Sequence, residues 1–292
     1  MKKNLEKNIV LIGAGKTAHS LVANLSNINF KPNLIISKNI LSAKNLAEKF
    51  SIKNYSDDFS KIADKNLIVF ISTPDREIKN VALRLAKEKI NFSSSYFIHL
   101  SGAKNIDELK SLKLKNANCG TIHFMQTFPS KEVVNLNETL CVIEFSNSKV
   151  EKFLKSLANK MKLKVFTTES EIKIFYHLAG VFTSNFLVSN FYAAEKLLRK
   201  SGIKNISHLE LMKNIIETTL TNINKKGILH SLSGPIERGD VDTVRKHIVA
   251  LKKEKKLSNL YKLNSLNLLD LLAEKNKALT KEQKIIIEIL NK

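Results

Sequence analysis

The chain has 292 residues, of which 43% are hydrophobic, so it is long enough to form one large domain or two ordinary domains with a substantial core. Its apolar runs are too short to span a membrane, and its lysine-rich start lacks the apolar region of a signal peptide, so we expect a cytoplasmic protein without a membrane partner. The net charge of +21 comes from lysines spread along the whole chain, with only five Arg among 48 basic residues, and this distribution disfavours nucleic acid as a partner.

The first expected strand covers residues 9–12, an unbroken apolar run typical of a strand buried on both faces. Gly13, Gly15 and Ala18 follow in the pattern G-x-G-x-x-A, and apolar residues at helical spacing come next. A strand, a glycine turn and a helix in this order favour a dinucleotide-binding turn, in which the helix N-terminus faces the pyrophosphate. The alternative is a glycine turn that only joins the strand to the helix. The expected cofactor-binding residues of the turn are Gly13, Ala14, Gly15, Lys16, Thr17 and Ala18.

The second expected strand, residues 33–37, bears on the identity of the cofactor. NAD-binding folds usually place Asp or Glu at its end to hold the ribose 2′-hydroxyl, whereas this chain has Ser37 and Lys38. A hydroxyl and an ammonium group suit a 2′-phosphate, so we expect both residues to bind NADP(H). Because lysine is abundant here, the alternative is that Lys38 is one more solvated side chain.

Two further expected strands, residues 67–72 and 96–100, each end in a turn of small residues. Open α/β sheets bind their ligands at the carboxyl ends of the strands, so these turns are candidate contacts to the cofactor. The expected contacts are Ser72, Thr73, Pro74 and Ser101.

A strand over residues 118–122 leads to His123 and Gln126, which we expect to contact substrate at the same edge of the sheet. For His123 the alternative is a capping or core role. Neither of the two cysteines, Cys119 and Cys141, has other metal-ligating residues at the spacing of a known metal-binding motif. We therefore expect two buried apolar thiols and no metal site.

Strands are also expected over residues 139–145 and 164–168, but after residue 168 only helical periodicity remains. The expected fold is therefore α/β, with two domains. Residues 1–168 form an N-terminal Rossmann-type parallel sheet that binds NADP(H), and residues 169–292 form an all-α C-terminal domain for substrate binding and dimerisation.

The first helix of the C-terminal domain, residues 172–200, is long and largely apolar, so we expect it to be buried against the first domain or a partner subunit. A polar stripe runs along it at helical spacing, with Asn185 close by, and consists of Lys173, His177, Gly180 and Ser184. Such a stripe indicates either a substrate-facing cavity or a hydrogen-bond network between helices. For carbonyl reduction, His177 and Lys173 are both candidate proton donors, and Asn185 is suited to orienting the carbonyl.

A second dense motif, SGPIERGD, covers residues 233–240. Gly and Pro predict a sharp loop, and Asp240 is expected to cap the helix that follows. Ser233 and Arg238 are candidate contacts to a substrate carboxylate, a task for which an Arg fork is suited. The alternative is a plain helix-to-helix turn.

These motifs occur in a defined order, namely G-x-G-x-x-A at 13–18, Ser37-Lys38, Ser101-Gly102, GTIHFMQTF at 120–128, YHLAGVFTSNFL at 176–187 and SGPIERGD at 233–240. Over about residues 8–255 the chain resembles bacterial Rossmann-like reductases with a helical C-terminal domain, a family formerly of unknown function that includes alternative ketopantoate reductases. It is more remotely similar to ketopantoate reductase, pyrroline-5-carboxylate reductase and prephenate dehydrogenase.

The resemblance implies roles for individual residues. Ketopantoate reductases carry a catalytic lysine, followed by asparagines, on the first long helix of the C-terminal domain. Matching Asn185 to the later asparagine places His177 at the catalytic position, whereas matching the lysine selects Lys173. Ser233 matches the serine that holds substrate, and His123 is similar to the histidine region of prephenate dehydrogenases. Because related reductases commonly pair through the helical half, a homodimer is expected.

We therefore expect an NADPH-dependent reductase of a small 2-oxo acid, with 2-dehydropantoate, an intermediate of pantothenate synthesis, as the leading substrate. One alternative is a prephenate-like or imine-reducing oxidoreductase. The alternative from another class is a non-catalytic NADPH-binding sensor.

Overall fold

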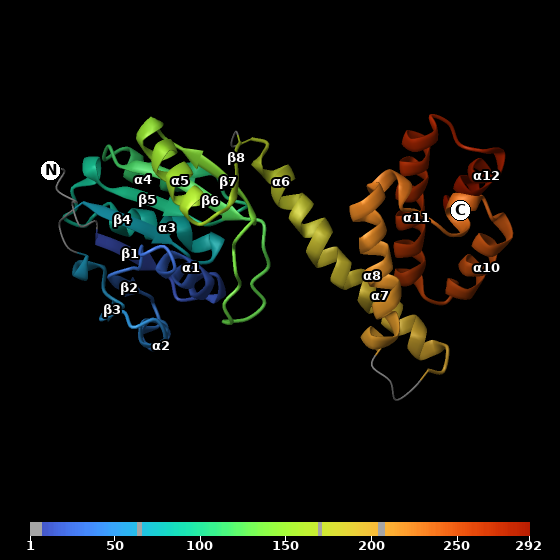
Figure 1. The fold of residues 1–292 in the computed structure, drawn as a ribbon, viewed down its shortest axis with the longest axis horizontal. Helices are drawn as coiled ribbons and strands as arrows, with labels where there is room; N and C mark the ends of the chain where they lie inside the picture. The colour runs from blue at the N-terminus through green and yellow to red at the C-terminus, as the bar shows by residue number, and fades with distance from the viewer. Residues whose placement is uncertain (1–7, 63–65, 169–170, 204–207) are drawn as a thin grey trace. The chain divides into compact units, whose positions relative to one another are not determined.

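A computed structural model describes residues 8–62, 66–168, 171–203 and 208–292 (Figure 1). The chain divides into two compact units, Met1–Leu187 and Val188–Lys292, which are described separately. The first unit alternates strands with helices: β1 (Asn8–Ile12), α1 (Lys16–Ser26), β2 (Leu34–Ile36), α2 (Ile40–Lys49), β3 (Asn54–Ser56), β4 (Leu67–Ile71), α3 (Asp75–Leu85), β5 (Tyr96–His99), α4 (Lys110–Lys113), β6 (Asn118–Phe124), β7 (Leu140–Phe145), α5 (Ser148–Lys160), β8 (Lys164–Thr167) and α6 (Lys173–Gly180).

All eight strands form one sheet in the order β3-β2-β1-β4-β5-β6-β7-β8. The first six in this order have the strand arrangement of a dinucleotide-binding Rossmann fold, and every pair among them is parallel. The expected α/β fold is therefore confirmed. The sheet departs from the expected all-parallel arrangement at one place, because β7 pairs antiparallel to β6.

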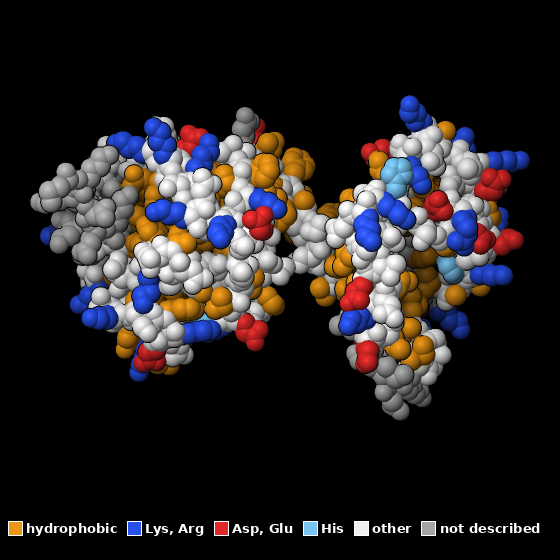
Figure 2. All heavy atoms as spheres, viewed as in Figure 1, with side chains coloured by type: hydrophobic (Ala, Val, Ile, Leu, Met, Phe, Trp, Pro, Cys, Tyr) orange, Lys and Arg blue, Asp and Glu red, His pale blue; other side chains and the backbone are white. Residues whose placement is uncertain are grey.

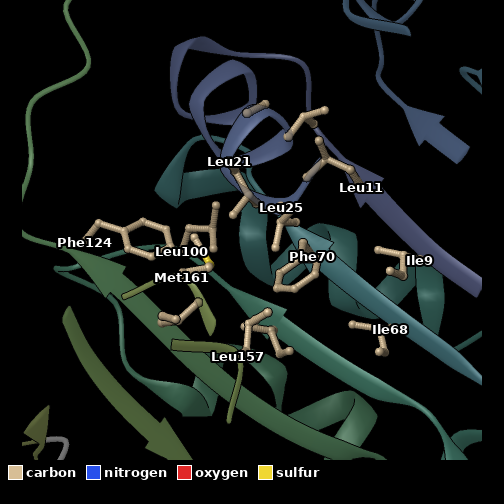
Figure 3. Packing of buried hydrophobic residues seen from close by; sticks show 14 of the residues in the cluster. Ile9, Leu11, Leu21, Leu25, Ile68, Phe70, Leu100, Phe124, Leu157 and Met161 are labelled. Atoms are coloured by element: carbon tan, nitrogen blue, oxygen red, sulfur yellow. The ribbon is translucent and has the colours of Figure 1, made fainter. Parts of the chain in front are cut away.

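Alternating apolar side chains of the strands build a core on each face of the sheet. Figure 3 shows one core, in which Ile9 and Leu11 of β1 lie with Phe70 of β4, Leu21 of α1 and Leu157 of α5. The other core uses the intervening strand residues, such as Val10 and Ile12, against α3. Because helices pack on both faces of the sheet, the turns that follow the carboxyl ends of the strands are the expected place for a ligand.

The helix expected over residues 172–200 occurs as three consecutive segments. After α6, a π-helical turn covers Val181–Asn185, and α7 covers Phe186–Lys200. The expectation that this helix is buried within the chain is wrong, because Lys173 is the only fully buried side chain among its described residues. Its large apolar side chains are exposed instead, at 68% for Phe175, 64% for Phe182 and 59% for Tyr192. Burial by a partner subunit stays a prediction.

The second unit contains the end of this helical stretch and, among the described residues, the longer helices α8 (His208–Lys226), α10 (Val241–Leu251), α11 (Lys255–Asn276) and α12 (Lys281–Leu290), with the short helix α9 (Pro235–Arg238) between α8 and α10. Its core is formed by Ile236, Val244, Leu269, Leu272, Ile286 and Leu290. The expected change from mixed to purely helical structure falls after β8, whereas the compact units divide twenty residues later, after Leu187. The assignment of separate functions to residues 1–168 and 169–292 stays a prediction.

Candidate functional site

The turn between β1 and α1 has the geometry that a bound diphosphate requires. Gly13 has φ +107°, and a Cβ there would lie 2.4 Å from the carbonyl oxygen of Ser72, so only glycine fits. Gly15 is the N-cap of α1, where no side chain caps the helix and no acidic residue lies in the first turn. A Cβ added to Gly15 would meet nothing within 4 Å. The amide groups at this helix N-terminus are therefore open to an anion, and the turn fits a dinucleotide.

The other candidate cofactor residues follow β2, β4 and β5 at the same edge of the sheet. Lys38 is exposed and Ser37 is half-buried, so both are accessible to a ligand phosphate. The hydroxyl Oγ1 of Thr73 is buried without a hydrogen-bond partner among the described residues, and the Ser72 amide donates to the carbonyl of Ile12 at 2.7 Å. An unpartnered polar atom beside the glycine turn is what a missing ligand would leave.

Ser101 differs from these residues because its side chain already forms a hydrogen bond within the protein. Its Oγ accepts a hydrogen bond from the amide of Lys104 at 2.9 Å, and its own amide donates to Nδ1 of His99 at 3.3 Å. The other ring nitrogen of His99 contacts the carbonyl of Asn105 at 2.9 Å. Burial, with the nearby charge of Lys173, lowers the pKa of His99 to about 4. Neutral His99 therefore orders the turn that contains Ser101 and Gly102.

A cavity of about 260 Å³ opens beside the end of β6 and combines several of the candidate substrate residues. Of the expected residues, it brings together His123, Gln126, His177, Ser184 and Asn185. Sequence reasoning missed the other side chains that line it, which are Met125, Thr127, Tyr176, Val181 and Thr183. The π-helical turn explains why Asn185 joins the face that carries His177, because a wider turn displaces the residues that follow it. Tyr176 is adjacent to His177 in sequence, and no spacing signal distinguished it from a core aromatic residue.

Two histidines meet at one end of this cavity. The ring centroids of His123 and His177 are 5.7 Å apart. His123 is packed edge-on against Tyr176, its Nδ1 is buried without a partner among the described residues, and burial lowers its pKa to about 3. A Cβ on Gly102 would lie 2.6 Å from Nε2 of His123 and 2.7 Å from Nδ1 of His177. The glycine thus allows both rings to approach the β5 turn.

Lys173 does not face the cavity, although it shares the helical stripe with His177. Its side chain is 2% exposed, and Nζ donates to Oε2 of Glu144 at 2.6 Å, to Oγ1 of Thr121 at 3.1 Å and to the carbonyl of Lys104 at 2.7 Å. At this position the stripe takes part in a hydrogen-bond network and not in the cavity, because a buried ammonium group requires acceptors, although these come from the sheet and its loop and not from another helix. The role of Lys173 as a proton donor stays a prediction. Of the two candidate proton donors, His177 lines the cavity.

The SGPIERGD motif lies in the second unit. Asp240 caps α10 as expected, with its carboxylate accepting from the Thr243 amide at 3.0 Å. The Glu237 carbonyl accepts from the side chain of Gln283 at 3.0 Å, which ties the motif to α12. The side chains of Ser233 and Arg238 are exposed. Neither belongs to the cavity of the first unit, and their contact with substrate stays a prediction.

Other expectations concern the cysteines, metals and membranes. Cys119 and Cys141 are buried free thiols, as expected, and burial raises the pKa of each to about 12. Within the described ranges, no cluster of His, Cys, Asp and Glu could hold a metal ion. None of the helices described is both long enough and apolar enough to cross a bilayer. Figure 2 shows the Lys and Arg side chains of the visible face scattered over both units.

The sheet order, the open glycine turn and the cavity at the strand ends define a Rossmann-type dinucleotide-binding protein. Comparison with protein families agrees with this class. Residues 1–126 match shikimate/quinate 5-dehydrogenase, and residues 139–268 match a domain of unknown function, DUF2520. The expected resemblance to Rossmann-like reductases with a helical C-terminal domain is thereby confirmed. A comparison with curated proteins finds no match.

Solved structures share the fold over nearly the whole chain. A protein from Bacteroides fragilis, provisionally described as an NADP oxidoreductase, is 25% identical, with a TM-score of 0.75 and coverage of 89% of this chain and 97% of its own. A protein from Thermotoga maritima is also 25% identical, with a TM-score of 0.71 and coverage of 92% and 100%. Prephenate dehydrogenase from Aquifex aeolicus is 14% identical, with a TM-score of 0.55 and coverage of 90% and 98%, which shows a shared fold. The chain therefore has an oxidoreductase-like fold.

Proposed function

We propose that this protein is an NADPH-dependent reductase of a small 2-oxo acid, with 2-dehydropantoate as the leading substrate. The observation that carries the proposal is the cavity at the carboxyl ends of the strands, in which His177 and His123 face amide and hydroxyl side chains. Such a cavity offers a proton donor and neutral hydrogen-bonding groups together, as the reduction of a carbonyl requires.

The cofactor assignment rests on the turn after β1 and on the solved relatives. The amides that follow Gly13 and Gly15 would hold the diphosphate, and Ser37 and Lys38 would hold the 2′-phosphate. The B. fragilis relative, described as an NADP oxidoreductase, supports NADP(H) rather than NAD(H). When bound, NADPH supplies a hydride to the carbonyl carbon.

His177 is the group that we assign to the proton. It donates a proton to the carbonyl oxygen as the C–O double bond is reduced, which yields the 2-hydroxy acid, and then regains a proton from solvent because its side chain is only half-buried. His123 stays neutral because burial holds its pKa near 3, so it acts as a hydrogen-bonding neighbour and not as a second charge.

The amide and hydroxyl groups of the cavity orient the substrate. Asn185 is assigned to the carbonyl oxygen, and Gln126 and Ser184 are assigned to the substrate's polar groups. Among the side chains that line the cavity there is no Lys or Arg. Ser233 and Arg238 of the second unit stay candidate contacts to a substrate carboxylate, through a hydroxyl group and a guanidinium group respectively.

A panel of carbonyl substrates tests the function. Purified protein and NADPH would be mixed separately with 2-dehydropantoate, prephenate and pyrroline-5-carboxylate, and the loss of NADPH absorbance would be followed. Turnover of 2-dehydropantoate supports the proposal. Turnover of either other compound alone would replace it with the prephenate-like or imine-reducing alternative, of which the former shares this fold. Tight binding of NADPH without turnover of any compound would instead indicate a sensor.

A further inference from the structure

Lys173 and Glu144 form a buried ion pair that connects α6 to the sheet. Lys173 is the first residue of α6, and the three groups that accept its hydrogen bonds come from β6, from β7 and from the loop after β5. Thr121 also donates to Oε2 of Glu144 at 2.9 Å, which closes a triangle of side chains. The ammonium group thus joins α6 to β6, to β7 and to the loop after β5.

Stability alone does not explain such a network. Each buried charge loses its hydration, and an apolar pair of similar size commonly stabilises a fold as well or better. A directional network instead selects one placement of the elements that it joins, because its hydrogen bonds are satisfied only there. The side chains of Lys173 and Glu144 are 2% and 3% exposed, and their ion pair determines where α6 lies on the sheet.

The residues that this placement controls are those of the cavity. His177 follows Lys173 by one helical turn, and His123 follows Thr121 by two strand residues, so each histidine lies beside its anchor on the same face of its element. Lys104 belongs to the loop that the Ser101 side chain holds. Gly102 lies in the same loop, and a Cβ added to it would meet both histidine rings. A displacement of α6 would therefore separate His177 from His123 and from Gly102 at once.

We propose that Lys173 is a positioning residue that, through Glu144, Thr121 and the Lys104 carbonyl, sets the placement of His177 in the cavity and does not itself transfer a proton. This inference rests on the proposed function of His177. It assigns to Lys173 a role that differs from that of the catalytic lysine of ketopantoate reductases.

The test compares Lys173→Met with Lys164→Met, which removes an exposed ion pair to Glu138 in the same unit. For Lys173→Met we expect kcat to fall on the order of tenfold or more with KM little changed, because a misplaced donor slows the chemical step. His177→Gln, which removes the assigned donor, should lose more of kcat than Lys173→Met does. Nitrogen-detected NMR of the histidine rings should show the His177 and His123 resonances displaced in Lys173→Met and unchanged in Lys164→Met.

The opposite pattern would overturn the inference. If Lys173→Met abolished turnover while His177→Gln retained it, Lys173 would be the donor. Thr121→Val retains the ion pair and removes the two hydrogen bonds of the Thr121 hydroxyl, so it serves as the milder variant if Lys173→Met does not fold, and it should move the same two resonances by less. Unchanged ring resonances in both variants refute positioning even when turnover falls. Absence of turnover with the wild-type protein refutes the proposed function, while the resonances still decide the positioning role.

Discussion

The ring centroids of His123, in β6, and His177, in α6, lie 5.7 Å apart, with an angle of 69° between the ring planes. Both side chains are half-buried, but Nδ1 of His123 is buried without a partner among the described residues, whereas His177 lines the cavity. Burial lowers the pKa of His123 to about 3, so this ring stays neutral.

Replacing His177 should remove the proton donor. We expect His177→Ala to lose on the order of a hundredfold or more in kcat with the substrate that the panel identifies, while NADPH binding is retained. Stopped-flow measurement of NADPH oxidation and fluorescence titration of the cofactor would check the two parts. His230→Ala, which removes an exposed histidine of the second unit, is the matched control. An unchanged rate in His177→Ala would exclude this side chain from the mechanism.

A methyl group on Gly102 should disturb the histidine pair directly. Its Cβ would lie 2.6 Å from His123 and 2.7 Å from His177, so at least one ring must move in Gly102→Ala. We expect a loss of about tenfold or more in kcat with NADPH affinity retained. Ala103→Ser, an exposed change at the next position, should have no effect on the rate. Equal rates in the two variants would show that the ring placement is unimportant for turnover.

Lys38 should distinguish the two nicotinamide cofactors. If its ammonium group binds the 2′-phosphate, Lys38→Ala weakens NADPH binding by about tenfold, or about 1.4 kcal/mol, and leaves the weaker NADH binding unaltered. Calorimetric titration of both cofactors measures the ratio. Lys79→Ala removes another exposed lysine of the first unit as the control. A ratio equal to that of the wild type would mean that Lys38 is only a solvated side chain.

Acid should destabilise the first unit through His99. Its pKa is about 4 in the folded protein, against an ordinary histidine pKa of 6.5, so the unfolded chain binds the proton more tightly. The stability associated with neutral His99 is complete above about pH 6.5 and is lost as the pH falls toward 4, with about 2 kcal/mol lost between roughly pH 7.5 and pH 5. Urea unfolding of wild type and His99→Asn at both pH values measures this difference, which should be smaller in the variant. An equal acid loss in both proteins would contradict the assignment.

The exposed apolar side chains of α6, the π-helical turn and α7 support the expected homodimer. Phe182 and Tyr192 are 64% and 59% exposed, which is unusual for side chains of this size on a helix without a partner. We expect gel filtration with light scattering to give the mass of a dimer. Phe182→Ser combined with Tyr192→Ser should shift the mass toward the monomer, whereas Leu114→Ser, at a 77% exposed position elsewhere, should not. A monomeric wild type would refute the expectation.

Local signals were sufficient for most of the first unit. The apolar run of β1 and the glycines after it determine a strand and a turn within a few residues, and no distant contact alters them. The antiparallel pairing of β7 escaped prediction because strand direction depends on the path of the chain through residues 125–139, which has no pattern of its own.

The candidate site was predicted in part for a related reason. Helical spacing placed His177, Gly180 and Ser184 on one face correctly, and all three line the cavity. The same spacing misplaced Lys173, because its direction is decided by Glu144, which is distant in sequence and carried no signal of its own. Spacing within one element predicts a shared face, whereas the partner that a side chain meets depends on packing between elements.

The π-helical turn at Val181–Asn185 places one more residue in its hydrogen-bonded ring than an α-helical turn does. Residues before and after the turn therefore do not share one α-helical periodicity. A single helical-wheel projection drawn through both parts is wrong by one residue for the part after the turn. When this helix is aligned with those of proteins that share the fold, residues up to Gly180 and residues from Phe186 onward need separate registers. An insertion or deletion confined to this turn would rotate the remainder of the helix while leaving every side chain of α6 in place.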